Sequence, residues 1–359
     1  MKTLPVAILL TLMFGMAAPA YTQNKETETK WQAISKEAIS HYEKGQYERA
    51  VAAVKKSLAV AEKVVGPNHP NAATSLNNLA ELYRDHSEYA LAEPLYKRSL
   101  AIREKYFGSN HTLVATSLNG LAELYRAEGR YTEAEPLYKR ALAIREKAHG
   151  PNHPNVAQTL NNLAELYCIQ GQYASAKPLY ERSMAIREKM LGSNHPDMAI
   201  SLNNLALIYH TENRYAQAEP LYKRTLTIRE KTLGLDHPDV GRDLGNLAEL
   251  YRLQGQYAQA EPFYERSLAI FEKAAGPYHL NMATSLNNLA FIYHTRGQYA
   301  QAEPFYKRAL GIFEKALGPD HPDVKTSLDN LAKLYRATDQ ITAAEELDQR
   351  LARLQITRQ

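Results

Sequence analysis

The stretch GPNHPNAATSLNNLAELYRDHSEYALAEPLYKRSLAIREKYF, residues 66–107, decides the architecture because its pattern returns every 42 residues along the chain. Its opening glycine recurs at Gly66, Gly108, Gly150, Gly192, Gly234, Gly276 and Gly318, and a histidine three residues later recurs at His69, His111, His153, His195, His237, His279 and His321. A unit of this length cannot bury its own apolar face, so neighbouring units must stack and cover one another. We therefore expect one elongated array and a long binding surface.

Two helical patterns lie within each repeat unit. Leu76, Leu79, Ala80 and Tyr83 lie at i, i+3, i+4 and i+7, which is one face of an α-helix. A break follows, and sister units place a glycine there, as a left-handed turn after a helix favours. A second pattern then runs through Tyr89, Ala92, Tyr96, Ser99 and Ile102. Each unit is thus predicted to be a helix–turn–helix.

The array is predicted to hold eight units and to fill residues 29–356. Their expected bounds are 29–69, 70–111, 112–153, 154–195, 196–237, 238–279, 280–321 and 322–356. The last unit loses the usual aromatic residues to Ile341 and Asp348, which suits the polar outer face of a terminal cap. A short leader, residues 21–28, precedes the array, and a tail, residues 357–359, follows it.

Residues 1–20 have the composition of a secretory signal peptide. A lysine precedes a short apolar run, and Ala18-Pro19-Ala20 offers the small-residue pattern of a cleavage site. We expect cleavage before Tyr21 and an exported protein, periplasmic or secreted, that is not inserted in a membrane. The alternative is an uncleaved anchor, although the run is shorter than the ~20 residues that span a bilayer. Cys168 is the only cysteine, so no intramolecular disulfide can form.

Composition and motifs argue against several functional classes. Net charge is +4 with both signs interspersed, which gives no reason to expect nucleic acid or an anionic membrane as a partner. No phosphate-binding loop, nucleophile elbow or zinc-protease motif is present, so we expect no catalytic residues and no cofactor. The loop histidines are not expected to bind metal. Equivalent positions on packed helices lie about 8–10 Å apart, whereas zinc needs its ligand atoms about 2 Å from one centre. A His–Pro helix start with a hydrogen bond explains them better.

These residues resemble the tetratricopeptide repeat. Leu76, Leu79-Ala80, Tyr83, Tyr89, Ala92, Tyr96 and Ser99 occupy the places of that family's pattern. The 42-residue length, with SLNNLAELY and AEPLYKRSLAIREK, is similar to the kinesin light chain subtype in particular. The resemblance implies an all-α fold, a right-handed α-solenoid of about eight units whose first helices line a concave groove. Such grooves bind an extended peptide or a helix of a partner protein. The chain has no heptad coiled coil before the repeats, so a motor-adaptor role is not implied.

A polar stripe on the first helices supplies the candidate binding residues. Thr74, Asn77, Glu81 and Arg84 share one side of the first helical pattern, which by the resemblance faces the groove. Amides pair with a peptide backbone and guanidinium groups grip carboxylates. The candidates are Asn77, Asn119, Asn161, Asn203, Asn287, Arg84, Arg126 and Arg252. The alternative is that these side chains solvate the helix or cross-link neighbouring units. The following asparagines, such as Asn78, Asn162 and Asn204, are assigned to contacts between units.

Interruptions of the stripe are candidates for selectivity. Gly245 replaces the asparagine, while Leu207 and Phe291 replace the glutamate. These two apolar residues are predicted sockets for a partner's side chain, or else incidental surface hydrophobes. The leading hypothesis is a non-enzymatic scaffold, monomeric, that binds an extended segment of a protein partner. The alternatives are a self-assembling array and, less favoured, a hydrolase or RNA-binding protein. The RNA-binding alternative is less favoured because glutamates on the polar stripe would repel the phosphates of RNA.

Overall fold

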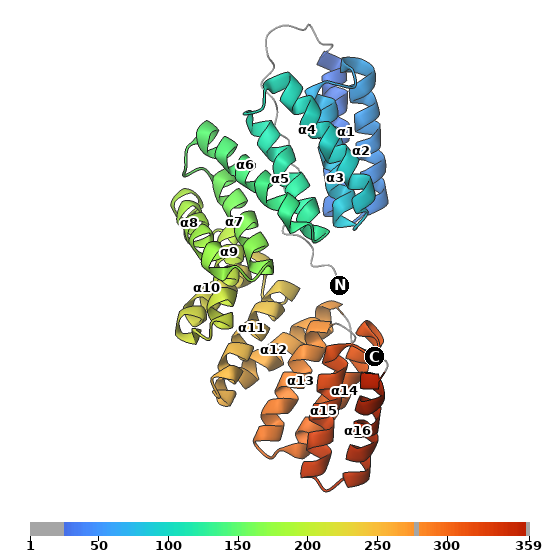
Figure 1. Ribbon diagram of the computed structural model, residues 1–359, viewed down its shortest axis with the longest axis vertical. Helices are drawn as coiled ribbons and strands as arrows, with labels where there is room; N and C mark the ends of the chain where they lie inside the picture. The colour runs from blue at the N-terminus through green and yellow to red at the C-terminus, as the bar shows by residue number, and fades with distance from the viewer. Residues whose placement is uncertain (1–24, 276–279, 357–359) are drawn as a thin grey trace. The chain divides into compact units, whose positions relative to one another are not determined.

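The computed structural model describes residues 25–275 and 280–356, which form sixteen α-helices (Figure 1). They are α1 (Lys25–Glu43), α2 (Tyr47–Val65), α3 (Pro70–Asp85), α4 (Tyr89–Phe107), α5 (Thr112–Ala127), α6 (Tyr131–His149), α7 (Pro154–Ile169), α8 (Tyr173–Leu191), α9 (Pro196–Thr211), α10 (Tyr215–Leu233), α11 (Pro238–Leu253), α12 (Tyr257–Ala275), α13 (Leu280–Thr295), α14 (Tyr299–Leu317), α15 (Pro322–Ala337) and α16 (Ile341–Ile356). The expected signal peptide, Gly276, His279 and the tail lie outside the described residues. α1 begins at Lys25, inside the segment expected to be a leader.

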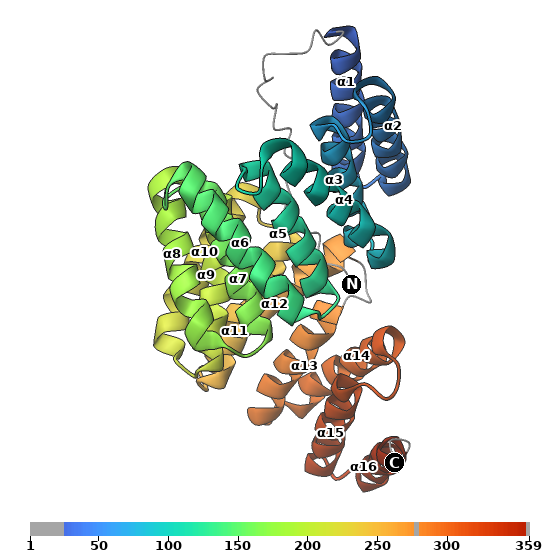
Figure 2. The same cartoon turned by 45° about the horizontal axis from the view of Figure 1, so that its top comes forward.

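The helices pair as helix–turn–helix units, which confirms the predicted all-α solenoid of about eight repeats. Odd-numbered helices are called first helices here and even-numbered helices second helices; within a pair the two pack side by side (Figure 2). The chain divides between Ile186 and Arg187, within α8, into two compact bodies. The N-terminal body holds α1 to α7 and most of α8, and the C-terminal body holds α9 to α16. No described helix combines the length and apolar content that a membrane crossing requires.

The loop histidines cap the first helices. Nδ1 of His69, His111, His153, His195, His237 and His321 each accepts a hydrogen bond from the backbone N–H two residues later, at 3.1–3.2 Å. This bond satisfies one of the N–H groups that a helix start leaves without a partner. The predicted combination of a helix start and a hydrogen bond is confirmed at these six positions.

The turn between paired helices needs one residue with positive φ. Gly129 takes it at φ 77°, as predicted for a glycine at this place. In three units Ser87, Asn213 and Asp339 adopt the same conformation at φ 58–61°. The turn geometry is therefore set by the packing of the two helices, even where no glycine is present to favour it.

Small residues and tyrosines form the core of each body. Alanines of the paired helices, such as Ala80 and Ala92 in one repeat unit, are fully buried and let the helices approach closely. The second-helix tyrosines Tyr96, Tyr138, Tyr180, Tyr222, Tyr264 and Tyr306 are at most 1% exposed. These tyrosines are therefore core residues of the repeat units.

Ion pairs join successive second helices on the solvent side. Each runs from an arginine to a glutamate 36 residues earlier, at 2.5–2.7 Å: Arg98–Glu62, Arg140–Glu104, Arg182–Glu146, Arg224–Glu188, Arg266–Glu230, Arg308–Glu272 and Arg350–Glu314. Exposed pairs contribute only about 0–1 kcal/mol each. At the C-terminus, Ala344 is the one buried side chain among those described in α16, which agrees with a solvent-facing cap.

Candidate functional site

The predicted asparagine ladder is not an open surface in the N-terminal body. Asn77, Asn119 and Asn161 are only 3–6% exposed. In the C-terminal body Asn203 and Asn287 are half-buried. The expectation that all five amides lie on an accessible stripe is therefore wrong for the first three. Helix packing covers these three positions, which the spacing along a single helix cannot reveal.

The buried amides connect repeat units. Asn119 Nδ2 donates to Glu123 Oε1 at 2.8 Å, and Asn162 Nδ2 donates to the same oxygen at 2.7 Å and to Asn119 Oδ1 at 3.4 Å. In the C-terminal body, Asn246 donates to Asn203 and Asn330 donates to Asn287, both at 3.2 Å. The assignment of the second asparagine to contacts between units is confirmed at these positions.

The predicted guanidinium groups are also engaged. Arg84 is 8% exposed, and its Nη1 lies 2.5 Å from Glu123 Oε2 on the next first helix. Arg126 pairs with Glu165 at 3.1 Å in the same way, while Arg252 pairs within its own helix with Glu249 at 2.6 Å. Arg84 and Arg126 therefore cross-link neighbouring units, the alternative left open by the sequence.

The two predicted apolar sockets differ from each other. Leu207 is 49% exposed and remains an open apolar position. Phe291 is half-buried, with its ring centroid 6.3 Å from that of Tyr257 and 5.2 Å from the Arg252 guanidinium. Phe291 thus belongs to a packed cluster, and the prediction of an open socket there is wrong.

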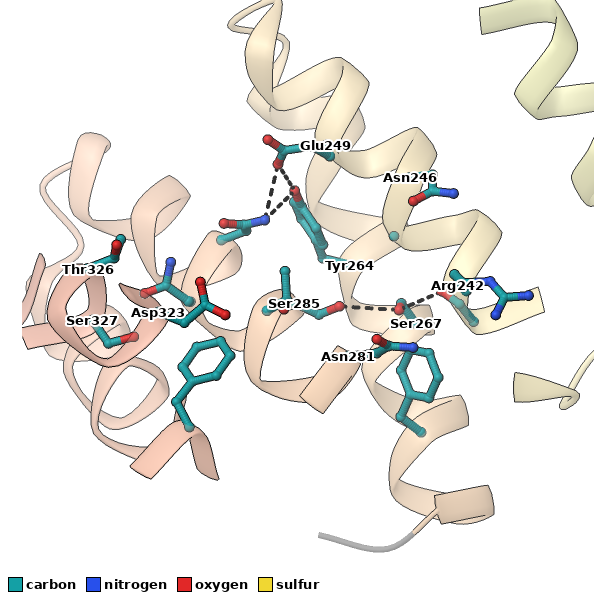
Figure 3. A pocket seen from close by; sticks show the side chains of 17 residues that line it. Arg242, Asn246, Glu249, Tyr264, Ser267, Asn281, Ser285, Asp323, Thr326 and Ser327 are labelled. Atoms are coloured by element: carbon teal, nitrogen blue, oxygen red, sulfur yellow. Dashed lines mark hydrogen bonds between the residues drawn. The ribbon is translucent and has the colours of Figure 1, made fainter. Parts of the chain in front are cut away.

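A cavity of about 440 Å³ in the C-terminal body is the candidate site that the structure adds. Three successive first helices, α11, α13 and α15, line it, and α12 and α14 contribute its deeper residues. Figure 3 shows Arg242 and Asn246 of α11 and Asp323 and Ser327 of α15 around it, with Ser267 and Ser285 between them. Amides, hydroxyls and the rings of Phe271 and Phe313 thus face one space. A concave site with convergent polar groups is the usual form of a binding pocket.

Glycine opens the cavity on the α11 side. Gly245 stands where sister units place the ladder asparagine. A Cβ built at Gly245 would have as nearest neighbours only Ser267 Oγ at 3.7 Å and Ser285 Oγ at 4.0 Å. A Cβ at Gly241 would instead lie 3.2 Å from Phe271 Cζ. Gly245 therefore leaves space, whereas Gly241 makes room for the neighbouring phenyl ring.

The phenyl rings of Phe271 and Phe313 replace arginines that are buried elsewhere. Arg103, Arg145, Arg187 and Arg229 occupy the equivalent second-helix position and are 3–7% exposed. Burial lowers the pKa of Arg103 and of Arg145 to about 10. Sequence reasoning missed this change, although the switch from arginine to phenylalanine in two consecutive repeats is visible in the sequence.

The rim near α11 is tied together by a small network. The Tyr264 hydroxyl donates to Glu249 Oε2 at 2.7 Å. Asn288 Nδ2 donates both to that carboxylate oxygen and to the Tyr264 hydroxyl oxygen, each at 3.1 Å. Burial acts to raise the pKa of Glu249, but hydrogen bonds from Arg252 and Tyr264 outweigh it and lower that pKa. Glu249 is therefore a satisfied anion.

Other reactive groups give no second site. Burial raises the pKa of the Cys168 thiol to about 11, with Tyr180 acting in the opposite direction. Because the thiolate is the reactive form, the raised pKa disfavours reaction of this cysteine near neutral pH. Within residues 25–275 and 280–356, no cluster of three or more histidine, cysteine or carboxylate side chains is arranged to hold a metal ion.

Comparison with known proteins agrees with the repeat pattern. A family model described as Tetratricopeptide repeat matches residues 32–105, 87–147, 113–189, 156–231, 197–273, 239–315 and 281–356. No curated protein matches the chain.

Several solved structures are similar. A variant of a Podosopora anserina kinesin light chain-like protein with nearly identical TPR-like repeats shares 31% identity, covering 57% of this chain and 97% of that chain, with a TM-score of 0.50. BtubC (BKLC) from P. vanneervenii shares 21% over 71% and 94%, with a TM-score of 0.53. The apo quorum sensor NprR from B. thuringiensis shares 16% over 92% of each chain, with a TM-score of 0.63. The last two show a common fold.

Proposed function

Because the chain belongs to the tetratricopeptide repeat family, we propose that it is a non-enzymatic scaffold that binds an extended peptide segment of a partner protein. The observation that carries this proposal is the cavity lined by α11, α13 and α15. A peptide lying across three successive first helices would contact three repeat units at once. Repeats of this family are typically non-catalytic, which supports a binding role.

The amides at this cavity are suited to a peptide backbone. Asn246 uses Nδ2 to bond Asn203, and Asn287 uses Oδ1 to accept from Asn330. These bonds use one atom of each amide, so Asn246 Oδ1 can serve as an acceptor and Asn287 Nδ2 as a donor for a peptide. An extended chain presents both complementary groups at every residue other than proline. We therefore propose a peptide site in the C-terminal body and not along the buried asparagines of the N-terminal body.

The cellular location remains a prediction of the sequence. Residues 1–20 carry the features of an export signal, and we propose a periplasmic or secreted monomer that begins at Tyr21. Amino-terminal sequencing of the protein from its native host tests the cleavage, and light scattering tests the monomer. An intact Met1 on membrane-bound material would contradict the export of a soluble form.

The peptide site is tested by filling the cavity. A library of random linear peptides is selected on the full mature protein, and the affinity of enriched peptides is measured by fluorescence anisotropy. Gly245→Leu is expected to weaken binding more than about tenfold, because its side chain occupies the cavity. Gly311→Leu is the matched control. Gly311 is also inside a helix, and a Cβ there meets nothing within 4 Å. If no peptide is enriched, the function is contradicted; if Gly245→Leu binds normally, the location is wrong.

A further inference from the structure

Buried arginines in the middle of the array share one pair of acceptors. In each case Nη1 donates to a backbone carbonyl at the start of the next first helix and to a hydroxyl four residues later on that helix. The pairs are Leu113 C=O at 3.1 Å and Ser117 Oγ at 2.8 Å for Arg103, Asn155 C=O at 2.9 Å and Thr159 Oγ1 at 2.7 Å for Arg145, and Asp197 C=O at 2.8 Å and Ser201 Oγ at 2.6 Å for Arg187. Three junctions of the array thus hold a guanidinium group with the same two kinds of acceptor at the same positions.

The same site is present at α15 without its arginine. Phe313 stands at the arginine position, while Asp323 and Ser327 stand at the positions of the two acceptors. Both Asp323 and Ser327 line the cavity (Figure 3). Ser327 is fully buried, and its Oγ has no hydrogen-bond partner among the described residues. A buried hydroxyl without a hydrogen bond destabilises the folded protein, so a ligand that bonds it removes that destabilisation.

We propose that this site receives the guanidinium group of an arginine side chain carried by the partner peptide. The inference rests on the proposed function and names the side chain that the cavity selects. The guanidinium would donate to Asp323 C=O and Ser327 Oγ, as the internal arginines do at their own acceptors. The phenyl ring of Phe313 offers a face for a cation, and the Asp323 carboxylate adds an opposite charge.

The charges around the cavity favour a cation. Arg242, Glu249 and Asp323 are its ionisable acidic and basic residues. Arg242 pairs with Asp239 at 2.6 Å, and Glu249 pairs with Arg252 at 2.6 Å. Within the described part of the chain, Asp323 forms an ion pair with His321 at 3.5 Å, and histidine is charged only when protonated. A carboxylate without a permanent counter-charge among the described residues thus lines the same cavity as the unpaired hydroxyl.

Alternative side chains satisfy fewer of these groups. An apolar side chain would fill the cavity but leave Ser327 Oγ unpaired. A lysine supplies a point charge, whereas the planar guanidinium reaches two acceptors in a fixed geometry. The equivalent hydroxyl at α13, Ser285, is already hydrogen-bonded to Ser267 at 3.3 Å. The site is therefore assigned to α15 alone.

The test uses blocked pentapeptides of glycine with one central residue. Binding of the arginine peptide to the full mature protein is measured by calorimetry and compared with that of the citrulline peptide, its neutral isostere, and with free arginine. The arginine peptide is expected to bind about tenfold more tightly than the citrulline peptide, since hydrogen bonds from a charged donor are the stronger. Equal affinities for the two peptides would overturn the proposal. If free arginine binds as tightly as the arginine peptide, the proposal that the guanidinium group is carried by a peptide is wrong.

Two variants and a control locate the site. Ser327→Ala is expected to lower the affinity about threefold to tenfold. Phe313→Arg is expected to place its own guanidinium on Asp323 and Ser327 and to abolish binding of the arginine peptide. Ser201→Ala, which alters a site that already holds Arg187, should leave affinity unchanged. Unchanged binding in Ser327→Ala overturns the proposal even if Phe313→Arg fails to fold. Library peptides that still bind without preferring arginine would overturn this inference and leave the proposed function intact.

Discussion

The α6–α7 junction of the N-terminal body and the α14–α15 junction of the C-terminal body share one helix–turn–helix plan but hold different residues at the second-helix position of the buried arginines. At the first, Arg145 fills the junction and bonds the next helix through Asn155 C=O and Thr159 Oγ1. At the second, Phe313 stands there, Ser327 Oγ is unpaired, and a cavity lies beside both. A repeat protein can thus convert a structural junction into a candidate binding site by a few substitutions, because the repeated helices supply the remaining groups.

The largest expected effect on stability comes from comparing two buried arginines, one paired with a carboxylate and one bonded to neutral acceptors. Arg229 pairs with the fully buried Asp243 at 2.5 Å, whereas Arg145 bonds only neutral acceptors. Arg229→Ala should cost about 3–5 kcal/mol, because Asp243, whose pKa burial already raises to about 7, must then stay buried without its counter-charge or take up a proton. Arg145→Ala should cost about 1–3 kcal/mol. Hydrogen exchange of α10–α11 and α6–α7 measures the two losses locally. Arg229→Ala/Asp243→Ser should recover part of the stability, and equal costs for the two single variants would contradict the distinction.

The second comparison uses two helix glycines. A Cβ at Gly120 would lie 2.6 Å from Cε1 of the fully buried Tyr96, whereas a Cβ at Gly245 meets nothing closer than 3.7 Å. Gly120→Ala should destabilise by about 1–3 kcal/mol through overpacking. Gly245→Ala should stabilise by about 0.5–1 kcal/mol, because glycine is unfavourable within a helix. Opposite shifts in Tm are expected, and a rise in both variants would show that the N-terminal junction is loosely packed.

The third comparison concerns the asparagines. Asn119 bonds Glu123 and Asn162, whereas Asn287, within the part of the chain that the structure describes, accepts a bond from Asn330. Asn119→Ala should lower the free energy of unfolding by about 0.5–1.5 kcal/mol for each bond lost, without weakening the binding of selected peptides. Asn287→Ala should lower stability less and weaken peptide binding. Urea denaturation and anisotropy on the same samples measure both. Reversed roles of the two residues would return the site to the N-terminal ladder.

The smallest expected effect is a pH dependence of the histidine caps. Burial lowers the pKa of His111 and His153. The charge of Arg103 adds to this at His111, and those of His149 and Arg145 add to it at His153. A folded pKa below the unfolded value of 6.5 means that the cap's stability is fully present above pH 6.5 and is lost as the pH falls below it. Each cap should lose up to about 1 kcal/mol.

The caps of the C-terminal body provide the comparison. His195 and His237 have a carboxylate 3.9–4.0 Å from Nδ1, on Asp197 and Asp239, which can pair with a protonated ring. Hydrogen exchange between about pH 7.5 and 5.5 should therefore show α5 and α7 loosening more than α9 and α11. His111→Asn keeps a capping oxygen and should remove the effect at α5. If that variant loosens as much as the wild type on acidification, the cap is not the cause.

The sequence by itself determined the repeat. The apolar spacing from Leu76 to Tyr83, the alanines and the capping histidines are local features that one helix and its turn define, so period and helix bounds could be predicted. A hydrogen bond at the helix start followed from the same local pattern, whereas the atom that accepts it, Nδ1, is known from the structure.

Only the tertiary structure decided which polar groups are available. Asn77 and Asn287 occupy equivalent positions in the repeat, yet Asn77 is 3% exposed and Asn287 borders a cavity. Their difference arises from residues on other helices: Arg103 fills one junction, whereas Phe313 and Gly245 leave space near the other. Burial is a property of neighbours that lie far apart along the chain, and a pattern read along one helix does not contain them.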